Sequence, residues 1–519
     1  MNTFLQRHQA EVKGSLSGLD RIRFRGTLRW LASLRGMSSF LAVSGVLLKN
    51  FTDWAQAWTA QILLATDELV QRAGRPLTYL PSSQERKEER ARALADADGI
   101  EEGLIGVFKC VEPCRTFTIS RNRALKKLEL RQITGKCAHL YFYVQHRQLG
   151  LMHVRLQTWA PFTVHMCWNG REWLARQLRR LGIGFEKRDN CFVDVQDVAR
   201  AQALLTGQLR TNWNKLLDGL LAKVHPAHAT MFGERPMNYY WSAEETEWAT
   251  DVMFRSPEAL ACRYPRWLRH ALTTYGSDDV LRFLGRRPEA WRFHGSEVTS
   301  TLKTRPEGTR IKHQHNRNAL KMYDKQGSVL RVETTINDAR DFRTYRPKEG
   351  DASGVKAWRS LRKGVADLHR RAQVSQKANE RYLEALAAVD HPQTLQEVAT
   401  PMCQATKWHG RRVRGLQPFR DDDAKLLQTI LRGEFAINGF RNRDLRSLLF
   451  GDAEPIAGPE KRRQAAKVTR MLRLLRAHGI IRKVAKTHRY QLTERGRNAT
   501  VALSAAQQAS TQQLAALAG

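Results

Sequence analysis

The sequence predicts a mixed α+β protein built from several domains. Residues 419–500 place apolar side chains at helical spacing, whereas residues 140–168 and 309–334 alternate apolar and polar side chains as strands do. The 519 residues are 42% hydrophobic, which is enough for several cores at roughly 150 residues per domain. We expect these regions in order: a helical region at 1–102, an α/β domain at 103–235, helices with a β-hairpin that complete the core at 236–355, a long basic helix at 356–400, a linker at 401–418, a helix-rich domain at 419–500 and a flexible tail at 501–519.

The chain is strongly basic. It carries 86 lysines and arginines against 51 acidic residues, a formal net charge of +35. A fold does not require such an excess, so the charge indicates a polyanionic partner, and nucleic acid is the expected one. An anionic membrane surface is the competing partner, but it needs an amphipathic or lipidated anchor that the sequence does not show.

The sequence shows no sign of membrane insertion or secretion. It has neither a run of 18 apolar residues nor the apolar core of a signal peptide. Its seven cysteines lack regular spacing, which is typical of a reducing compartment. We therefore expect a cytoplasmic protein without membrane contact.

Two segments of the N-terminal region have a clear local pattern. Asp20–Thr27 alternates basic and apolar residues, which predicts a short strand with Arg21, Arg23 and Arg25 on one face. These arginines would either contact phosphates or lie on a solvated strand edge. Trp54–Gln71 has the apolar spacing of an amphipathic helix.

Residues 103–235 predict a layer of strands and helices. Strand patterns at Leu140–Gln145, Leu151–Leu156 and Phe162–Trp168 precede a helix at Gly170–Leu181 and a strand at Cys191–Val195. This order is compatible with a ferredoxin-like or RNA-recognition-like sheet. The strands and their ends carry aromatic residues that either stack on unpaired bases or pack in the core: Tyr141, Phe142, Tyr143, Trp159 and Phe162.

Cysteine and histidine residues of this domain have the chemistry of metal ligands. Three residues separate Cys110 from Cys114, and one residue separates Cys137 from His139. Thiolates and imidazole are acceptable zinc ligands, but structural zinc sites usually space their pairs by two or four residues. Buried free cysteines are therefore favoured, and zinc is not expected.

Helices are expected in residues 236–290 and again after residue 356. Ser242 followed three residues later by Glu245 has the pattern of a helix N-terminus. Tyr239 and Tyr240 would then lie just before this helix, either as a hydrophobic staple or as groups that stack on bases or act as a nucleophile. An Arg- and Lys-rich pattern predicts a long helix from Ala357 to Val389.

Residues 309–334 predict β-strands around a turn at Gln326–Ser328. An even number of turn residues would put Asp324 on the same face as Arg331 and Glu333, whereas an odd number would separate these groups. On a shared face the two carboxylates converge, and a hard divalent cation, Mg²⁺ or Mn²⁺, could bind. The alternative is a cross-strand ion pair between Asp324 and Arg331 on a binding sheet.

The segments Lys321-Met-Tyr-Asp-Lys325 and Leu330-Arg-Val-Glu333 resemble the hairpin of rolling-circle replication initiators of plasmids and filamentous phages. In that family the hairpin helps to form a metal site, and a tyrosine attacks a DNA phosphate. The resemblance implies candidate catalytic residues at Tyr323, Asp324, Lys325 and Glu333. It also implies metal ligands at His313, His315, Asp324 and Glu333. The chain departs from the family at Gln314, where an apolar residue is usual, and by offering several tyrosines without a marked nucleophile.

Residues 419–500 give the strongest local signals. Helices are expected at Lys425–Leu431, Arg443–Leu449 and about 460–478, followed by strands at Ile480–Val484 and His488–Leu492. This order resembles the winged helix-turn-helix family, in which the third helix enters the major groove and the hairpin touches the DNA backbone. Residues 401–500 hold 23 Lys and Arg against 9 Asp and Glu. A solvated basic face on a protein-interaction domain is the alternative.

The predicted nucleic-acid contacts are basic residues of this domain and of the earlier strands. They are Arg443, Arg446, Lys461, Arg462, Lys467, Arg470, Arg473, Arg476, Lys483, Lys486, Arg489, Arg21, Arg23, Arg25, Lys312 and Arg317. The whole chain also resembles large bacterial proteins often linked to mobile elements, in the segments Thr134–Cys137, Tyr141–Tyr143, Trp159–Phe162, Asn169–Gly170, Gly433–Phe435 and Gly439–Asp444. This resemblance implies a bacterial, mobile-element setting and supplies no mechanism.

The sequence thus favours one function and leaves one alternative. The favoured function is DNA processing by a replication-initiator-like or transposase-like protein whose winged helix binds duplex. The alternative is a non-catalytic partner of a large structured RNA, or a DNA-binding repressor. In the first case Asp324→Ala or Glu333→Ala would abolish activity and leave binding intact.

Overall fold

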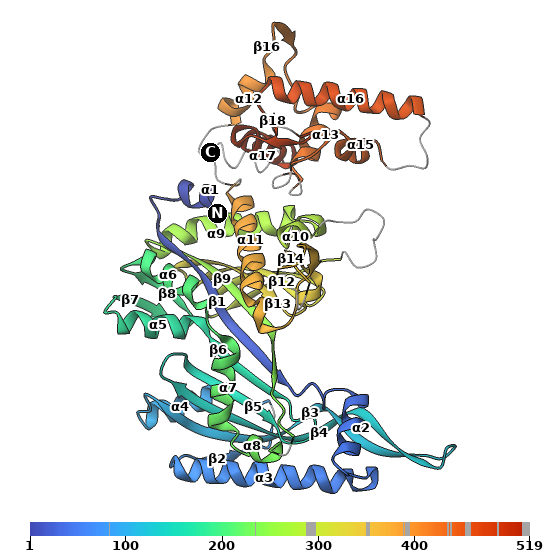
Figure 1. Ribbon diagram of the computed structural model, residues 1–519. Coiled ribbons are helices and arrows are strands. Elements are labelled where there is room, and N and C mark those ends of the chain that lie inside the picture. Colours follow the sequence, from blue (N-terminus) through green and yellow to red (C-terminus); the bar gives the residue numbers. More distant parts are fainter. Residues whose placement is uncertain are drawn as a thin grey trace.

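The computed structural model describes residues 1–510 except 83, 234, 287–296, 349–352, 388, 390–394, 433–434, 436–438, 452–457 and 485–486. The protein is mixed α/β, with one large central sheet (Figure 1). Neighbouring strands of this sheet are antiparallel, except the parallel pair at one edge, β2 and β3. The eleven strands follow the order β10 (Thr299–Arg305), β11 (Gly308–His315), β12 (Asn318–Lys325), β13 (Val329–Ile336), β9 (Tyr240–Phe254), β1 (Val12–Thr27), β6 (Val164–Asn169), β5 (Gly150–Gln157), β4 (Lys127–His146), β3 (Gly103–Asn122) and β2 (Leu77–Tyr79).

The long strands β1 and β9 hold the two halves of the sheet together. They pair from Val12–Phe254 to Thr27–Tyr240, and β1 also pairs with β6 while β9 pairs with β13. In Figure 1 these strands run from the middle of the molecule to its lower part. The expectation that residues 1–102 are mainly helical is therefore wrong for Val12–Leu19, the first half of β1, whereas its second half is the strand predicted at Asp20–Thr27. Its Gly and Ser residues weaken the strand signal, and both faces of its first half are covered, so the apolar–polar alternation is lost.

One face of the sheet is covered by helices along both halves. The half with β3 to β6 packs against α2 (Leu34–Val43), α3 (Phe51–Arg72), α7 (Trp213–Val224) and α8 (Ala227–Met231), and the half with β9 to β13 packs against α9 (Pro257–Thr274), α10 (Ser277–Phe283) and α11 (Leu368–Leu386). Apolar, buried strand side chains point to this face, among them Phe24, Phe142, Met166, Leu320 and Val332. This burial supplies most of the stability of the fold, because apolar area removed from water stabilises by roughly 25 cal/mol per Å².

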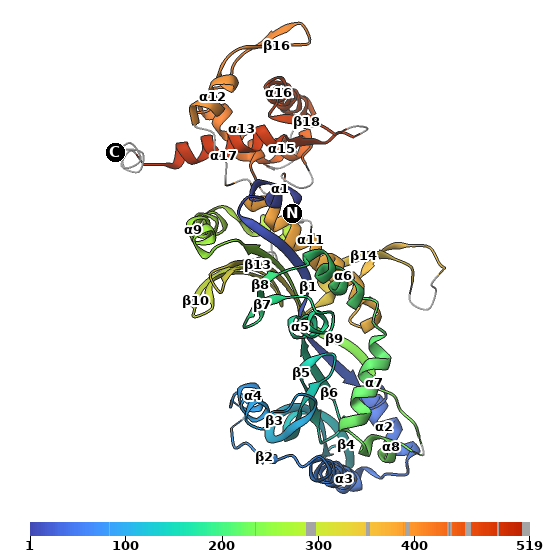
Figure 2. The same ribbon diagram turned by 90° about the vertical axis from the view of Figure 1, so that its left-hand side faces the viewer.

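The opposite face is covered only at its margins. Near β3 it meets α4 (Lys87–Ala97), and near the first half of β1 it meets α5 (Gly170–Arg180), β7 (Phe185–Arg188), β8 (Cys191–Val195) and α6 (Val198–Gln208). Gly18 allows α6 to approach, since a Cβ there would lie 2.8 Å from a methyl carbon of Leu205. Between these two covers the sheet face stays open, and Figure 2 shows α4 and α5 on either side of it.

The C-terminal elements form a separate core. They are α12 (Leu395–Cys403), β16 (Thr406–Trp408), β17 (Arg411–Val413), α13 (Asp421–Ile430), α15 (Asn442–Phe450), α16 (Gly458–Ala477), β18 (Ile481–Lys483), β19 (Tyr490–Leu492) and α17 (Glu494–Gln508). Apolar residues from all three helices α13, α15 and α16 meet in one cluster, including Leu427, Leu445 and Leu472. Three helices followed by a hairpin are thus present where local sequence predicts them.

The remaining short elements are α1 (Asn2–Arg7), η1 (Leu48–Asn50), η2 (Ala339–Asp341), β14 (Arg343–Arg346), β15 (Ala357–Ser360) and η3 (Val365–Asp367).

Two predicted helices are wrong in whole or in part. The segment after Ser242 is the strand β9, and Ser242 Oγ donates to Arg25 O across the sheet instead of capping a helix. The predicted helix from Ala357 begins only at Leu368, because residues before it form β15 and an extended turn at Gly364. A side chain at Gly364 would strike the hydroxyl of Tyr240, so this bend is fixed by packing.

The stretch 401–418, expected to be a linker, is also structured. It contains the end of α12 and the β16–β17 hairpin, in which Trp408 lies opposite Arg411. The tail predicted at 501–519 continues α17 as far as Gln508, and residues 511–519 lie outside the described part of the chain. Across the described ranges, none of the helices combines the length and apolarity that crossing a bilayer requires.

Candidate functional site

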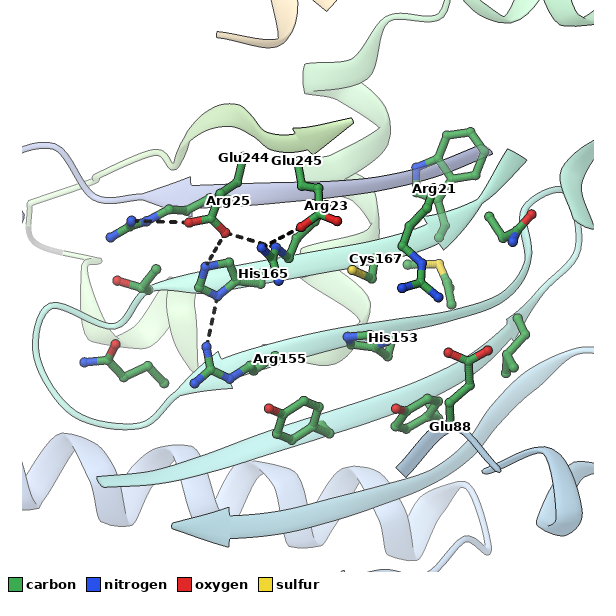
Figure 3. A pocket seen from close by; sticks show the side chains of 18 of the residues that line it. Arg21, Arg23, Arg25, Glu88, His153, Arg155, His165, Cys167, Glu244 and Glu245 are labelled. Atoms are coloured by element: carbon green, nitrogen blue, oxygen red, sulfur yellow. Dashed lines mark hydrogen bonds and ion pairs between the residues drawn. The ribbon is translucent and has the colours of Figure 1, made fainter. Parts of the chain in front are cut away.

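The register of the sheet places the three predicted arginines of β1 on its open face. Arg21, Arg23 and Arg25 lie opposite Asn169, Cys167 and His165 of β6, and the rows continue to His153 and Arg155 of β5. Together they line a depression of about 630 Å³ (Figure 3). The strand β1 is central in the sheet, so the alternative of a solvated strand edge does not apply to these arginines.

The charges in this depression are unequally compensated. Arg23 forms ion pairs with Glu244 at 3.2 Å and Glu245 at 2.9 Å, and Arg25 lies 3.8 Å from Glu244. A hydrogen bond from His165 and these arginines hold the pKa of Glu244 at about 2, so this carboxylate stays ionised. Arg21 is exposed and has no ion pair within the described ranges, which leaves its guanidinium group available to a ligand.

A second depression of about 910 Å³ adjoins the first and shares Arg21 and Asn169 with it. Its floor carries Lys321 and Tyr323 of β12 and Glu333 of β13. We call the two adjoining depressions the sheet trough. Lys312 and Arg317, also predicted contacts, line a further hollow of about 390 Å³ that includes Lys321.

The number of turn residues in the β12–β13 hairpin decides which face of the sheet Asp324 occupies. The turn has three residues, Gln326–Ser328, and its first two have positive φ values of 54° and 67°. Tyr323 therefore lies opposite Arg331 in the trough, whereas Asp324 lies opposite Leu330 and points to the helix-covered face. The odd-turn alternative therefore holds: Asp324 is separated from Arg331 and Glu333, and neither their convergence nor an Asp324–Arg331 ion pair is present.

The predicted histidine ligands also lie on the helix-covered face, away from Glu333. His313 is buried between Ser300, 2.8 Å from its Nδ1, and the Tyr382 hydroxyl, 3.2 Å from its Nε2. Burial lowers the pKa of His313 to about 4, so the ring is neutral near pH 7. Asp324 accepts the Thr309 backbone N–H at 2.5 Å. The set predicted from the initiator resemblance is thus divided between two faces of the sheet.

A different group of carboxylates meets in the trough. Asp20, Glu247 and Glu333 have oxygen atoms within 4.8 Å of one another, a spacing that a hard cation could bridge. Lys321 already lies among them, with its Nζ 2.9 Å from Glu247 and 2.5 Å from Glu333. Burial raises the pKa of the neighbouring Tyr323 to about 12, so its hydroxyl stays protonated near neutral pH. In this structure Glu247 and Glu333 therefore form ion pairs with Lys321.

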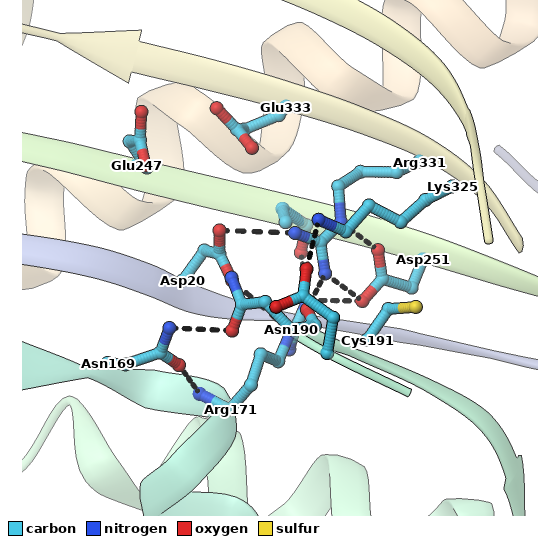
Figure 4. Close-up of polar contacts among 12 residues, drawn as sticks. Asp20, Asn169, Arg171, Asn190, Cys191, Glu247, Asp251, Lys325, Arg331 and Glu333 are labelled. Atoms are coloured by element: carbon cyan, nitrogen blue, oxygen red, sulfur yellow. Dashed lines mark hydrogen bonds and ion pairs between the residues drawn. The ribbon is translucent and has the colours of Figure 1, made fainter. Parts of the chain in front are cut away.

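Next to these carboxylates is a buried ion-pair network (Figure 4). Arg331 contacts Asp251 through two nitrogen atoms at 2.6 and 3.0 Å, and it contacts Asp20 at 3.1 Å. Arg171 of α5 adds a contact to Asp251 at 2.9 Å, while Asn190 donates to Asp20 at 2.8 Å. Burial opposes ionisation of Asp251, yet the two arginines hold its pKa below the usual range, whereas burial raises the pKa of Asp20. The network ties α5 and the β7–β8 turn to the centre of the sheet.

The other predicted basic surface lies on α16. Lys461, Arg462, Arg470 and Arg473 are exposed, and none has an ion-pair partner among the residues that the structure describes. By contrast, Lys467 lies 3.4 Å from Asp422. Four exposed arginines and lysines therefore remain uncompensated along one helix.

The β16–β17 hairpin extends this surface. The ring of Trp408 packs beneath the guanidinium groups of Arg473 and Arg476, at 5.5 and 5.0 Å from its centroid. Its strands add exposed basic residues that the sequence analysis assigned to a linker: Lys407, Arg411 and Arg412. We call these three with Lys461, Arg462, Arg470 and Arg473 the α16 surface. The signal that would have found the hairpin is the two-residue turn His409-Gly410, both with positive φ, between the paired residues Trp408 and Arg411.

The remaining predicted contacts lie close to these elements. Arg443 and Arg446 are on α15, Lys483 is exposed on β18 and Arg489 directly precedes β19, whereas Lys486 lies outside the described residues. The predicted stacking residues are mostly structural, since Phe142 and Phe162 are fully buried and Tyr143 is 3% exposed. In comparisons with known proteins, no protein-family model, no curated protein and no solved structure matches this chain.

Proposed function

We propose that this protein binds nucleic acid through the α16 surface and the sheet trough. The observation that carries the proposal is the row of uncompensated cations on α16, continued by the β16–β17 hairpin. Basic side chains at such density repel one another, and a polyanion relieves this repulsion while releasing its counterions. The net charge of +35 favours the same class of partner.

The order of elements supports duplex binding by the C-terminal domain. Helices α13, α15 and α16 followed by the β18–β19 hairpin occur in the order that a winged helix-turn-helix has. Asn442 of α15 donates to Ala465 O and to Thr469 Oγ1, both at 2.9 Å, which fixes α16 against α15. In this proposal α16 enters a major groove, and Lys483 on the hairpin contacts the backbone.

The trough suits the backbone of a strand more than its bases. Its available cation is the guanidinium group of Arg21, which is a phosphate ligand, whereas Lys321 is held by Glu247 and Glu333. The tyrosines that line it, Tyr141, Tyr143 and Tyr323, are buried or half-buried, so base stacking has little support here. A mobile-element setting, which the sequence resemblance implies, is compatible with this binding function.

Strand cleavage has weaker support than binding. The carboxylates Asp20, Glu247 and Glu333 could hold Mg²⁺ or Mn²⁺ only if the ammonium group of Lys321 moved away. A labelled single strand incubated with Mn²⁺ tests this function. The control is Glu307→Gln, because Glu307 is half-exposed and lines the same depression as Glu333. Cleavage that is lost in Glu333→Gln but kept in Glu307→Gln would establish strand cleavage as a function.

The binding proposal is tested by purifying the full chain without nuclease and sequencing the nucleic acid that accompanies it. Nucleic acid above the level found with a neutral control protein supports the proposal, and its absence contradicts it. A discrete long RNA would favour the ribonucleoprotein alternative over DNA binding. Mixed DNA fragments would favour the duplex-binding arrangement.

A further inference from the structure

Two thiols and an imidazole meet between β3 and β4. Cys114 lies on β3, and Cys137 and His139 lie on β4, with all three side chains on the same face as Tyr141. The two sulfur atoms are 3.2 Å apart, and Cys137 Sγ is 4.0 Å from His139 Nδ1. One ligand atom from each residue falls within 4.8 Å of the other two. The cluster is therefore formed by strand pairing, although its sequence spacing fits no usual zinc motif.

The imidazole in this cluster has an unused nitrogen. His139 is 1% exposed, and its Nε2 has no hydrogen-bond partner in the described parts of the chain. Its Nδ1 lies 3.1 Å from the Cys137 backbone oxygen, close enough to donate to it. Because Nδ1 is the nitrogen that lies 4.0 Å from Cys137 Sγ, metal binding through Nδ1 would replace the carbonyl contact, and binding through Nε2 would require the ring to turn toward the sulfur atoms. A buried polar atom without a partner is otherwise costly.

The donor set selects the metal. Two thiolates and one imidazole are ligands that zinc prefers, and two negative sulfurs would offset the charge of the ion in a buried place. Zinc–sulfur bonds of about 2.3 Å in a tetrahedral site put the sulfurs about 3.8 Å apart, so a small outward shift from 3.2 Å admits the ion. Cys110 is not part of the set, because its thiol donates to Glu112 at 3.2 Å.

We propose that Cys114, Cys137 and His139 bind one zinc ion whose fourth position is open to the sheet trough. Cys114 lines the first depression of the trough together with Arg115 and Gln157, so that side is reached by solvent. Glu112 does not fill the fourth position, since its carboxylate is held by Tyr141 and Arg155. Three protein ligands with one exchangeable position is the arrangement in which zinc activates water or binds a substrate atom.

The test measures metal in the full chain purified under reducing conditions without added chelator. We expect about one zinc per chain in the unaltered protein and in Cys110→Ser, the matched control on the same strand. Cys114→Ser, Cys137→Ser and His139→Gln should each lower the content at least about tenfold. Zinc below about 0.1 per chain in the unaltered protein, with no uptake when zinc is supplied, would overturn the proposal.

Measurements on the unaltered protein keep the proposal testable if a variant does not fold. Mercurial titration should release the zinc only as Cys114 and Cys137 react, after the exposed thiols of Cys262 and Cys403, and Co²⁺ in its place should show a thiolate charge-transfer band. Addition of cyanide should shift the visible bands of the cobalt form, because the fourth position is exchangeable. An unchanged cobalt spectrum would contradict the open position. A Cys114–Cys137 disulfide in protein purified from a reducing cytosol would contradict the metal site itself.

Discussion

The α16 surface gives the sharpest prediction, because its charges are exposed and uncompensated. The variant replaces Lys461, Arg462, Arg470 and Arg473 by Gln in the full chain. Each phosphate contact contributes a slope of about −0.9 to the dependence of log K on log salt for duplex DNA. Four contacts thus account for a slope of about −3.6, or about a 150-fold loss of affinity between 50 and 200 mM salt. We expect the slope of the variant to be shallower than that of the unaltered protein by this amount.

Fluorescence anisotropy with a labelled duplex at several salt concentrations measures both slopes. The matched control replaces four exposed arginines of α5, α6 and the chain just after α6, namely Arg179, Arg180, Arg200 and Arg210, by Gln. It removes the same net charge, so it should change the slope by less than about 1 if the place of the charge matters. A slope of the α16 variant within about 0.5 of the unaltered value would refute the reasoning. Equal changes of the salt slope in the two variants would show that the α16 surface contributes to binding only through its net charge.

Three further predictions concern the sheet. Arg21→Gln should reduce the salt slope for a labelled single strand by about 0.7, and Arg23→Gln should reduce it less because Glu244 and Glu245 already pair with Arg23; equal reductions would speak against a selective role for Arg21. Arg331→Met should lower the free energy of unfolding in urea by about 3–5 kcal/mol, since it leaves the buried carboxylates of Asp20 and Asp251 undercompensated. The control Arg340→Met removes the ion pair of an exposed arginine with Asp338 and should cost far less; comparable losses in the two variants would be inconsistent with the network. For His313, burial lowers the folded-state pKa to about 4, below the unfolded value of about 6.5. The stability from its neutral form is complete above pH 6.5 and declines by up to about 1.4 kcal/mol per pH unit as pH falls toward 4. His313→Gln should flatten this decline in urea unfolding at pH 7, 5 and 4, and an unchanged decline would show that His313 does not carry it.

Local signals predicted the elements that are held by short-range interactions. The helix α3, the strands β5 and β6, α5, β8 and the helices α13 and α16 lie within a few residues of their expected positions, whereas β4 begins well before the predicted Leu140. Each has a strong periodic pattern or an end signal, such as Asn169, whose side chain accepts from the backbone of Arg171 and Glu172 at the start of α5. Such local patterns and end signals favour an element before any tertiary contact forms.

The errors arise where tertiary pairing decides the outcome. The Ser242 to Glu245 spacing resembles a helix start, but β1 requires a partner along its whole length, and β9 supplies it. The face of the sheet that Asp324 occupies changes with one turn residue, and the sequence pattern allowed both an even and an odd number of turn residues. The cluster of Cys114, Cys137 and His139 depends on the register of two twenty-residue strands. Arg331 was seen as a partner of Asp324, whereas its actual partners come from β1 and β9.

Photo-crosslinking tests the central claim most directly, because it reports where nucleic acid lies on the unaltered protein. The full chain would be irradiated with a photoreactive duplex and, separately, with a photoreactive single strand, and the adducts would be located by mass spectrometry. The proposed function predicts duplex adducts on peptides of α16 and the β16–β17 hairpin, and single-strand adducts on β1 around Arg21. Adducts confined to other surfaces, or no adducts at low salt, would contradict it.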